Sequence, residues 1–444
     1  MVFFGLALST LIILEFIFVI LIFYLSKIFL SANNLFSGFD SRIHNFITLF
    51  SENHLAIGFF LITTLGSAIV VTTICLLAII WLFLEKRWSY IIGLLISVLG
   101  GVATSSLLKY LVARQRPIPT FYFENSFAWP SGHATIAVTL FLFLIYYAVR
   151  AYPRWSRDVG LVITTRLLVL LIGASRLYLG VHYFSDILGG YLLGFFWFIL
   201  VVIISRFLEK DDEPRRLKKS KQIGLIISFI VLFLMVFSTQ IFNSNVFKSI
   251  QRYSAINFTP LKNNNLSNLT FVSENLGGNN WQPIQFILNG PETSIKKALQ
   301  EASWIERASP TIPGVVKRGL GITFKQPFLT APLKPRYWHN QTNNLTFTKL
   351  VKDKKKNITY ILRLWLVAND NNQVNYLGEV SASQGFSLQF NEKESIIKKA
   401  IDELATSLNG SKFLDQSRTM TVAAKLKEDT KEVNDFTVYI FTFK

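Results

Sequence analysis

Long apolar runs are the feature that most constrains how this chain of 444 residues can fold. A helix needs about 20 predominantly apolar residues to cross the roughly 30 Å hydrocarbon core of a bilayer. Because lipid offers the backbone no hydrogen-bond partners, such runs must form helices that satisfy their own peptide groups. The sequence therefore predicts an all-α integral membrane bundle of about seven spans: residues 4–30, 58–84, 89–109, 134–151, 159–176, 184–207 and 222–242.

The composition supports a membrane protein and limits the other classes of function. Hydrophobic residues make up 51% of the chain and aromatic residues 14%, which is too apolar for a soluble protein of this length. Much of the net charge of +18 lies in loops between the apolar runs and comes without a nucleic-acid-binding motif, so we expect no nucleic-acid partner. The single cysteine, Cys75, excludes an intrachain disulfide and a cysteine-based metal cluster.

The placement of Lys and Arg predicts the orientation of the spans, because cytoplasmic loops carry an excess of these residues. Segment 206–221 contains seven of them, and the loops after the second and fourth spans contain five more. We therefore expect a cytoplasmic N-terminus, with the first run retained as an anchor because it has no small-residue cleavage signature. In the membrane region, the opposite, outer side carries only Lys27, Arg42, Lys109, Arg114, Arg116 and Arg176.

The character of the sequence changes after residue 242. Short strand-like runs at 283–288, 357–367 and 435–443 and helical patterns near 293–303 and 393–408 predict a soluble α+β domain that is long enough to bury its own core. The expected division of the chain is an anchor helix with its connection at 1–37, a membrane domain at 38–207, a basic cytoplasmic linker with the last span at 208–242, and an outer domain at 243–444.

Two cations stand at the outer end of the third run. Lys109 and Arg116 are seven residues apart, so a continuing helix would place both on one face, while Pro117 predicts that the helix ends near Arg116. Two fixed cations can hold phosphoryl oxygens and stabilise charge in a transition state. Basic residues that anchor a span end by snorkelling would show the same pattern, so the pair alone fits both roles.

A short turn, Pro130-Ser131-Gly132-His133, precedes the fourth run. Ser131 is a good helix N-cap, Gly132 lets the backbone approach a ligand closely, and the free amides at a helix start attract anions. His133 would then lie in the first turn beside that anion site. Plain helix capping with an incidental histidine explains the motif equally well when it is taken alone.

The third motif begins at Ser175-Arg176 and ends at Asp186. His182 and Asp186 are four residues apart and share a face on a helix, so Asp186 can accept a hydrogen bond from one ring nitrogen and leave the other as a nucleophile. Arg176 would lie on a different face of an unbroken helix, so we predict a turn near Gly180. A purely structural hydrogen bond is the alternative for an isolated His–Asp pair.

Taken together and in this order, the three motifs resemble the signature of the type 2 phosphatidic acid phosphatase family, which shares a fold with bacterial acid phosphatases and vanadium haloperoxidases. The resemblance covers roughly residues 38–205, and every motif position is filled. The one departure is Trp129 before Pro130, where the family commonly has Phe. We expect Trp129 to shape the pocket without abolishing the chemistry.

The resemblance implies a role for each motif residue. His182 would be the nucleophile that forms a phosphohistidine, Asp186 would orient it, and His133 would protonate the leaving oxygen and then activate water. No metal or other cofactor is implied, and the remaining histidines show no metal-ligand spacing (His44, His54 and His339). The phosphoryl group would be bound by Lys109, Arg116, Ser131, the Gly132 amide and Arg176.

Residues 243–444 resemble the domain that follows such phosphatases in LssY-type bacterial proteins, through Trp304 after a short helix and the strand-like run Tyr360 to Val367. No catalytic constellation is visible there, which leaves open a contact with an envelope partner. The basic run Lys354 to Lys356 fits either anionic head groups or a solvated hairpin turn. Glu15, a carboxylate within the first run, has no assigned role.

These observations predict a metal-independent lipid-phosphate phosphatase of a bacterial inner membrane, with its site and its C-terminal domain on the periplasmic side. The substrate would be a phosphomonoester or diphosphate on a lipid, of the undecaprenyl diphosphate, phosphatidylglycerophosphate or phosphatidate type. Two alternatives stay open: a lipid phosphotransferase that uses the same site, and a non-catalytic lipid-handling or envelope scaffold. The motifs select neither one lipid nor an oligomeric state.

Overall fold

The computed structural model describes scattered positions between 10 and 24, and residues 37–208, 217–242, 271–307, 333–353, 356–370, 373–384, 394–422 and 436–444. It divides into two compact units. The membrane unit comprises Met1–Asp40 and Ser51–Ile256, and the sheet unit comprises Ser41–Phe50 and Asn257–Lys444. Glu15, Lys354, Lys355 and most of the expected first span lie outside the described residues.

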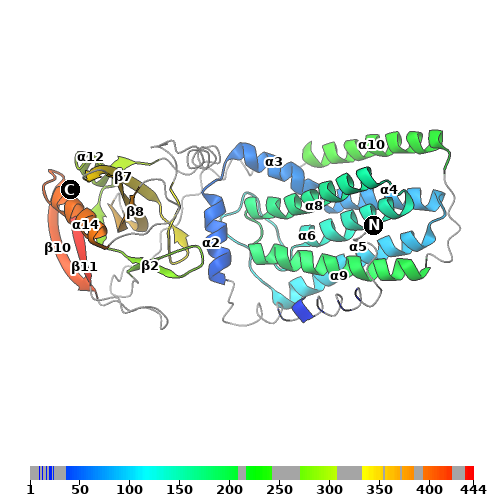
Figure 1. Cartoon of the computed structure of the whole chain (residues 1–444), viewed down its shortest axis with the longest axis horizontal. Helices are drawn as coiled ribbons and strands as arrows, with labels where there is room; N and C mark the ends of the chain where they lie inside the picture. The colour runs from blue at the N-terminus through cyan, green and yellow to red at the C-terminus, as the bar shows by residue number, and fades with distance from the viewer. Residues whose placement is uncertain are drawn as a thin grey trace. The chain divides into compact units, whose positions relative to one another are not determined.

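The membrane unit is a bundle of apolar helices (Figure 1). Six segments are long and apolar enough to cross a membrane within the described part of the chain, and they confirm the second to seventh expected spans. After α2 (Ser37–Thr48), which begins in this unit and ends in the other, the elements are α3 (Asn53–Thr64), α4 (Ala68–Leu84), α5 (Trp88–Val112), α6 (Gly132–Ile136), the π-helix η1 (Ala137–Leu142), α7 (Phe143–Ala151), α8 (Trp155–Tyr178), α9 (Phe184–Leu208) and α10 (Lys219–Phe242).

The end of α5 differs from the sequence prediction. The helix ends at Val112, four residues before Arg116, and not near Arg116 itself. Ala113 adopts the left-handed conformation (φ 49°), and its N–H donates to the Lys109 carbonyl at 2.9 Å, which closes the helix. Lys109 therefore lies on a helix and Arg116 on the loop that follows, so helical periodicity does not relate the two side chains.

Helix α9 packs directly against the start of α6. A Cβ atom added at Gly190 would lie 2.5 Å from the Ser131 carbonyl oxygen and 2.9 Å from the Ala134 Cβ. A Cβ added at Gly189 would lie 2.5 Å from the Trp129 indole nitrogen. Because real Cβ atoms do not approach so closely, only glycine allows this contact. The two glycines thus hold the turn before α6 against the first turns of α9.

The sheet unit confirms the predicted α+β domain. Its larger sheet has the strand order β10-β11-β3-β9-β8-β7-β4, in which only β11 and β3 pair in parallel, and its smaller sheet has the order β2-β1-β5-β6. The elements are β1 (Val272–Glu274), β2 (Asn280–Pro283), β3 (Phe286–Gly290), α12 (Glu292–Glu301), β4 (Ile305–Glu306), β5 (Tyr337–Trp338), β6 (Gln341–Thr342), β7 (Leu345–Asp353), β8 (Lys356–Asp370), β9 (Gln373–Gln384), α14 (Glu394–Asn409), β10 (Leu414–Val422) and β11 (Phe436–Phe443).

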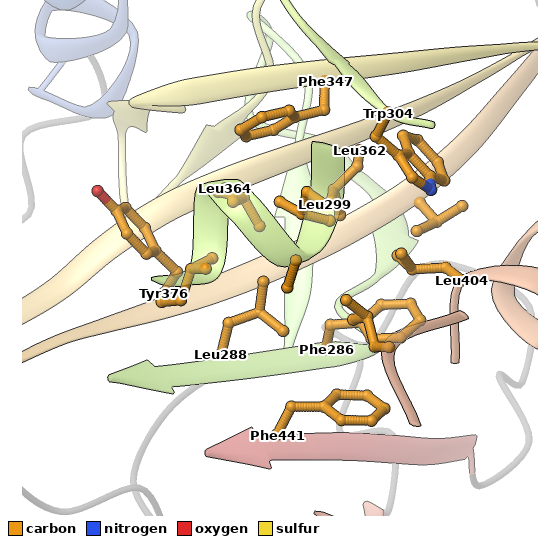
Figure 2. Close-up of a cluster of buried hydrophobic side chains, with 14 of the residues drawn as sticks. Phe286, Leu288, Leu299, Trp304, Phe347, Leu362, Leu364, Tyr376, Leu404 and Phe441 are labelled. Atoms are coloured by element: carbon orange, nitrogen blue, oxygen red, sulfur yellow. The ribbon is translucent and has the colours of Figure 1, made fainter. Parts of the chain in front are cut away.

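Helices α12 and α14 cover one face of the larger sheet. Leu299 of α12 and Leu404 of α14 pack with Leu362 and Leu364 of β8 and with Phe286 of β3 in one buried cluster (Figure 2). Alternate residues of β8 point to opposite faces, as strand geometry requires, so its other face contributes to a second cluster that includes Trp338 and Trp365. The unit therefore has its own core on both faces of the sheet.

A short segment from the N-terminal part of the chain belongs to the sheet unit. Arg42 donates to the Leu276 carbonyl at 2.8 Å and to the Asn340 side-chain oxygen at 2.6 Å, and it pairs with Glu274 at 3.2 Å. The expected membrane domain at 38–207 includes this segment, whereas the structure groups residues 41–50 with the C-terminal residues. The contacts join residues more than 230 positions apart, which no local sequence pattern indicates.

Candidate active site

The three sequence motifs meet at one end of the membrane unit. They lie at the end of α5, the start of α6, the end of α8 and the start of α9, and these helices contact one another (Figure 1). Direct hydrogen bonds and close contacts join the motifs. The Ser131 N–H donates to the Asp186 carbonyl at 2.9 Å, and Arg116 Nη1 lies 3.2 Å from His182 Nε2. All three motifs thus contribute to one cluster of buried polar side chains.

The loop between α5 and α6 holds the cations of the first motif. Lys109 Nζ donates to the Phe127 carbonyl at 2.6 Å. Arg116 donates from Nε to the Ser126 carbonyl at 2.6 Å and from Nη1 to the Val181 carbonyl at 2.6 Å. These side chains are anchored to backbone oxygens and turned into the protein, which distinguishes them from basic residues that snorkel toward a membrane surface.

Ser131 occupies the N-cap position of α6, but its side chain does not cap the helix. Its hydroxyl is fully buried and has no hydrogen-bond partner among the described residues. The Ser105 hydroxyl on α5, which the sequence reasoning did not select, is also buried without a partner and lies 3.9 Å from the point where a Cβ on Gly132 would be. Two unsatisfied hydroxyls beside Gly132 are available to hydrogen-bond a ligand.

The predicted turn near Gly180 is confirmed. Helix α8 ends at Tyr178, and Gly180 has a φ of +71°, a left-handed conformation that favours glycine. His182 lies in this turn, two residues before α9 begins, and not on a helix as the spacing suggested. Its Nδ1 lies 3.5 Å from Asp186 Oδ2, so the carboxylate faces the ring as expected, although Nδ1 forms no hydrogen bond within the described residues.

Asp186 has stronger partners than His182. Its Oδ1 accepts from Arg114 Nη1 at 2.5 Å and its Oδ2 accepts from the Tyr183 N–H at 2.7 Å. Arg114 also pairs with Asp40 at 2.7 Å and donates to Ser185 Oγ at 2.8 Å. Sequence reasoning counted Arg114 among the outer-side cations without giving it a role, and it found no signal at Asp40. Arg114 and Asp40 are therefore further candidates for positioning Asp186.

The described site also contains an acidic residue that the sequence reasoning missed. Glu124 Oε1 forms an ion pair with Arg176 Nη2, and Glu124 Oε2 lies 2.6 Å from Arg116 Nη2. Arg176 is fully buried, and its Nη1 donates to the Tyr122 hydroxyl and, at 3.1 Å, to Thr63 Oγ1. One sequence feature could have pointed to Glu124: it is the one acidic residue between positions 113 and 131, in the segment that joins the first two motifs.

The electrostatics of the site favour a neutral imidazole at His182. Burial lowers the pKa of His182 well below its usual value of 6.5, and Arg176 and Arg116 lower it further. Burial opposes the ionisation of Glu124, but Arg176 and then Arg116 outweigh that effect and hold the pKa of this carboxyl well below its usual range. The site therefore combines a neutral ring nitrogen with fixed cations, the combination needed for nucleophilic attack on an anionic group.

Four basic side chains gather at this site. Arg116 and Arg176 approach the same carboxylate, and Lys109 and Arg114 lie on the same segment that leads from α5 into the loop. No group of three or more His, Cys, Asp and Glu residues in the described ranges is arranged to hold a metal ion.

Comparison with known families agrees with this division of the chain. The PAP2 superfamily profile matches residues 88–210, which include all three motifs. A separate profile, the LssY C-terminus, matches residues 264–439 in the sheet unit. The resemblances that the motifs and the C-terminal pattern suggested are therefore confirmed.

Two curated proteins are similar to the membrane unit. Phosphatidylglycerophosphatase B of Bacillus subtilis is 34% identical over 158 residues, which cover 34% of this chain and 76% of the relative. Undecaprenyl-diphosphatase of Sulfolobus acidocaldarius is 33% identical over 114 residues, which cover 23% of this chain and 49% of the relative.

A solved structure is also similar in sequence. The crystal structure of a transmembrane PAP2-type phosphatidylglycerolphosphate phosphatase from Bacillus subtilis is 27% identical, with a TM-score of 0.40. The alignment covers 45% of this chain and 98% of that protein.

Proposed function

This chain belongs to the PAP2 superfamily, and on that premise we propose that it is a metal-independent phosphatase that removes a terminal phosphate from a membrane lipid. The substrate class is a phosphomonoester or diphosphate on a lipid, of the phosphatidylglycerophosphate, undecaprenyl diphosphate or phosphatidate type. The names of the two relatives support both kinds of phosphate group.

One observation carries the proposal: a buried imidazole whose Nε2 lies 3.2 Å from a guanidinium nitrogen. His182 is kept neutral because burial and the surrounding cations disfavour imidazolium and lower its pKa. A phosphoryl group paired with Arg116 would place its phosphorus within reach of that nitrogen. Close placement of nucleophile and electrophile, with charge stabilised by fixed cations, accounts for most of the catalysis of phosphoryl transfer.

The proposed reaction has two steps. In the first, His182 Nε2 attacks the phosphorus, the bond to the lipid oxygen breaks, and His133 donates a proton to that leaving oxygen. In the second, His133 takes a proton from a water molecule, which attacks the phosphohistidine and releases inorganic phosphate, so both histidines return to their starting state. Lys109, Arg116 and Arg176 stabilise the charge on the phosphoryl oxygens in both steps.

Asp186 supports this chemistry from the other side of the ring. Its carboxylate faces His182 Nδ1 at 3.5 Å and would stabilise the positive charge that develops on the ring as Nε2 attacks. Arg114 and the Tyr183 N–H hold Asp186 in place. In this proposal the Ser131 hydroxyl and the Gly132 amide donate to the phosphoryl oxygens.

The membrane topology is part of the proposal. The chain is a multi-pass membrane protein, and we assign it to a bacterial inner membrane because basic residues gather on the side of segment 206–221. The active site and the LssY-like domain at 243–444 then face the periplasm. In this proposal residues 38–207 form the membrane phosphatase domain, and residues 208–242 form the basic cytoplasmic linker and the last span.

The direct test is phosphate release from defined lipid phosphates by the purified full chain. We expect activity in the presence of a metal chelator, inhibition by vanadate, and a loss of about a thousandfold or more in His182→Ala because the nucleophile is removed. His54→Ala is the matched control, since His54 is exposed at the start of α3 and should leave the rate unchanged. Full activity in His182→Ala would refute the mechanism, and a phosphorylated acceptor among the products would identify a phosphotransferase.

A further inference from the structure

Glu124 pairs with two of the cations assigned to the phosphoryl group. One carboxylate oxygen contacts Arg176 and the other lies 2.6 Å from Arg116. The arrangement matches the way in which two oxygens of a phosphoryl group would contact the same two guanidinium groups. The carboxylate is thus placed where it imitates one edge of a bound phosphate.

The hydrogen bonds of Arg116 and Arg176 leave few N–H groups that could bind Glu124 and a phosphoryl group at the same time. Arg176 is fully buried, its Nη1 is used by Tyr122 and Thr63, and its Nη2 faces Glu124. Among the described residues only its Nε has no hydrogen-bond partner, so a phosphoryl group that also needs Nη2 must displace Glu124. Arg116 Nη1 is used by the Val181 carbonyl and adjoins His182, which leaves Nη2 for Glu124 and for Ser126.

Charge repulsion also disfavours binding of Glu124 and a phosphoryl group to the two arginines at the same time. Glu124 stays ionised because its pKa lies well below the usual range. A phosphate monoester carries a charge of about −1.5 to −2 at neutral pH, and like charges held next to each other in a partly buried site repel strongly. Simultaneous binding of both anions at the same guanidinium groups is therefore unfavourable.

We propose that Glu124 is an internal competitor for the phosphate site, displaced from Arg116 and Arg176 when a phosphoryl group binds. The proposal rests on the function proposed above and adds a residue that sets the affinity for every phosphoryl ligand. The carboxylate keeps the two guanidinium groups together between turnovers. By returning to them after hydrolysis, it promotes the release of inorganic phosphate.

The loop that carries Glu124 permits this movement. The Glu124 side chain is 23% exposed, whereas Arg176 is fully buried, so the acid and not the arginine is the partner that can rotate toward solvent. Beyond its arginine contacts, this rotation would break a hydrogen bond of 3.1 Å that the Tyr122 hydroxyl donates to Glu124 Oε1. The preceding residue on the loop, Phe123, is 85% exposed and therefore has little packing to lose. Rotation of Glu124 toward solvent therefore costs little burial.

The test is equilibrium binding of inorganic phosphate and of orthovanadate to the purified full chain, measured by calorimetry. We expect Glu124→Gln to lower both dissociation constants by about tenfold, because a neutral amide competes less strongly for two guanidinium groups than a carboxylate does. Glu124→Asp keeps the charge but is one methylene shorter and spans the two arginines less well, so it should tighten binding by a smaller factor.

The matched control is Asp158→Asn. Asp158 is also a carboxylate paired with an arginine, Arg157, at 2.7 Å, but it lies in the first turn of α8, at the opposite end of that helix from Arg176. This variant should bind phosphate as the wild type does. Unchanged or weaker binding in a folded Glu124→Gln protein would overturn the proposal, because it would show that Glu124 only positions the arginines.

The outcomes separate this inference from the proposed function. If Glu124→Gln binds phosphate more tightly but the wild type hydrolyses none of the lipid phosphates, the internal competitor is supported and the phosphatase assignment fails. If the wild type hydrolyses lipid phosphates but phosphate affinity does not rise in Glu124→Gln, the function is supported and the competitor fails.

Discussion

At the scale of single residues, the site depends on charges that are balanced in pairs. Arg114 lies between Asp40 and Asp186, at 2.7 Å and 2.5 Å, and Glu124 joins Arg116 to Arg176. Buried charges are stable only when paired and hydrogen-bonded, because each loses its hydration. The cations near His182 can therefore be concentrated only because carboxylates stand beside them.

The ionisation of His182 leads to a prediction about pH. Its pKa lies well below 6.5 because burial, Arg176 and Arg116 disfavour the protonated ring, so the nucleophile stays neutral as the pH falls from about 8 to 6.5. The substrate phosphate itself titrates at about pH 6, so kcat/KM must first be corrected for that ionisation. We then expect kcat/KM not to fall between about pH 8 and 6.5, because His182 is not protonated in that range. An acid limb centred at or above pH 6.5 after this correction would contradict the assignment.

At the scale of elements, glycine contacts align the helices. Gly189 and Gly190 bring α9 onto the turn before α6, and this approach lets the Ser131 N–H reach the Asp186 carbonyl at 2.9 Å. The motif residues are therefore placed by backbone contact between helices, and not only by side-chain contacts within the site.

This packing predicts the effect of a single methyl group. In Gly190→Ala the new Cβ would lie 2.5 Å from the Ser131 carbonyl oxygen, so α9 must move away from α6 and separate the second and third motifs. We expect kcat/KM to fall by about a hundredfold, because a displacement of about 1 Å can cost that much in an active site. The thermal unfolding temperature should also fall, because the contact between α9 and α6 loosens.

Gly160→Ala is the matched control for that substitution. Gly160 lies in α8, and an added Cβ would have no neighbour within 4 Å. Alanine stabilises a helix interior by about 0.5–1 kcal/mol relative to glycine, so stability should hold or rise and activity should be unchanged. Equal losses in the two variants would show that the close approach of α9 to α6 does not matter for catalysis.

At the scale of the whole molecule, the chain contains two units with separate cores. Every residue assigned to the phosphatase reaction lies in the membrane unit, while the buried clusters around Leu362 and Trp365 belong to the sheet unit. The segment Ser41–Phe50 precedes the described spans but is part of the sheet unit, through Arg42 and its contacts with Glu274 and Asn340.

Truncation tests how far the two units are independent in function. A chain that ends at residue 242 keeps all the assigned catalytic residues, so we expect it to hydrolyse the same panel of lipid phosphates at rates of the same order as the full chain. Segment 41–50 would lose its partners Glu274 and Asn340, so lower thermal stability is expected. Loss of activity for one lipid class alone would assign substrate selection to the sheet unit.

The sequence by itself determined the class of the protein and most of the candidate site. The spans could be predicted because transfer into hydrocarbon depends on local composition, and the turn at Gly180 could be predicted because a helix would have separated Arg176 from His182. The α+β character of residues 243–444 followed from alternating and helical patterns that are equally local.

Only the tertiary structure decided which charges meet. Glu124 and Arg176 are 52 residues apart in the chain, Asp40 and Arg114 are 74 apart, and Arg42 and Leu276 are 234 apart. Such pairs depend on how packed helices and strands bring distant segments together, which local periodicity does not encode. The end of α5 at Val112 was missed for a related reason, because Ala113 closes the helix in a left-handed conformation that propensity disfavours and the surrounding structure imposes.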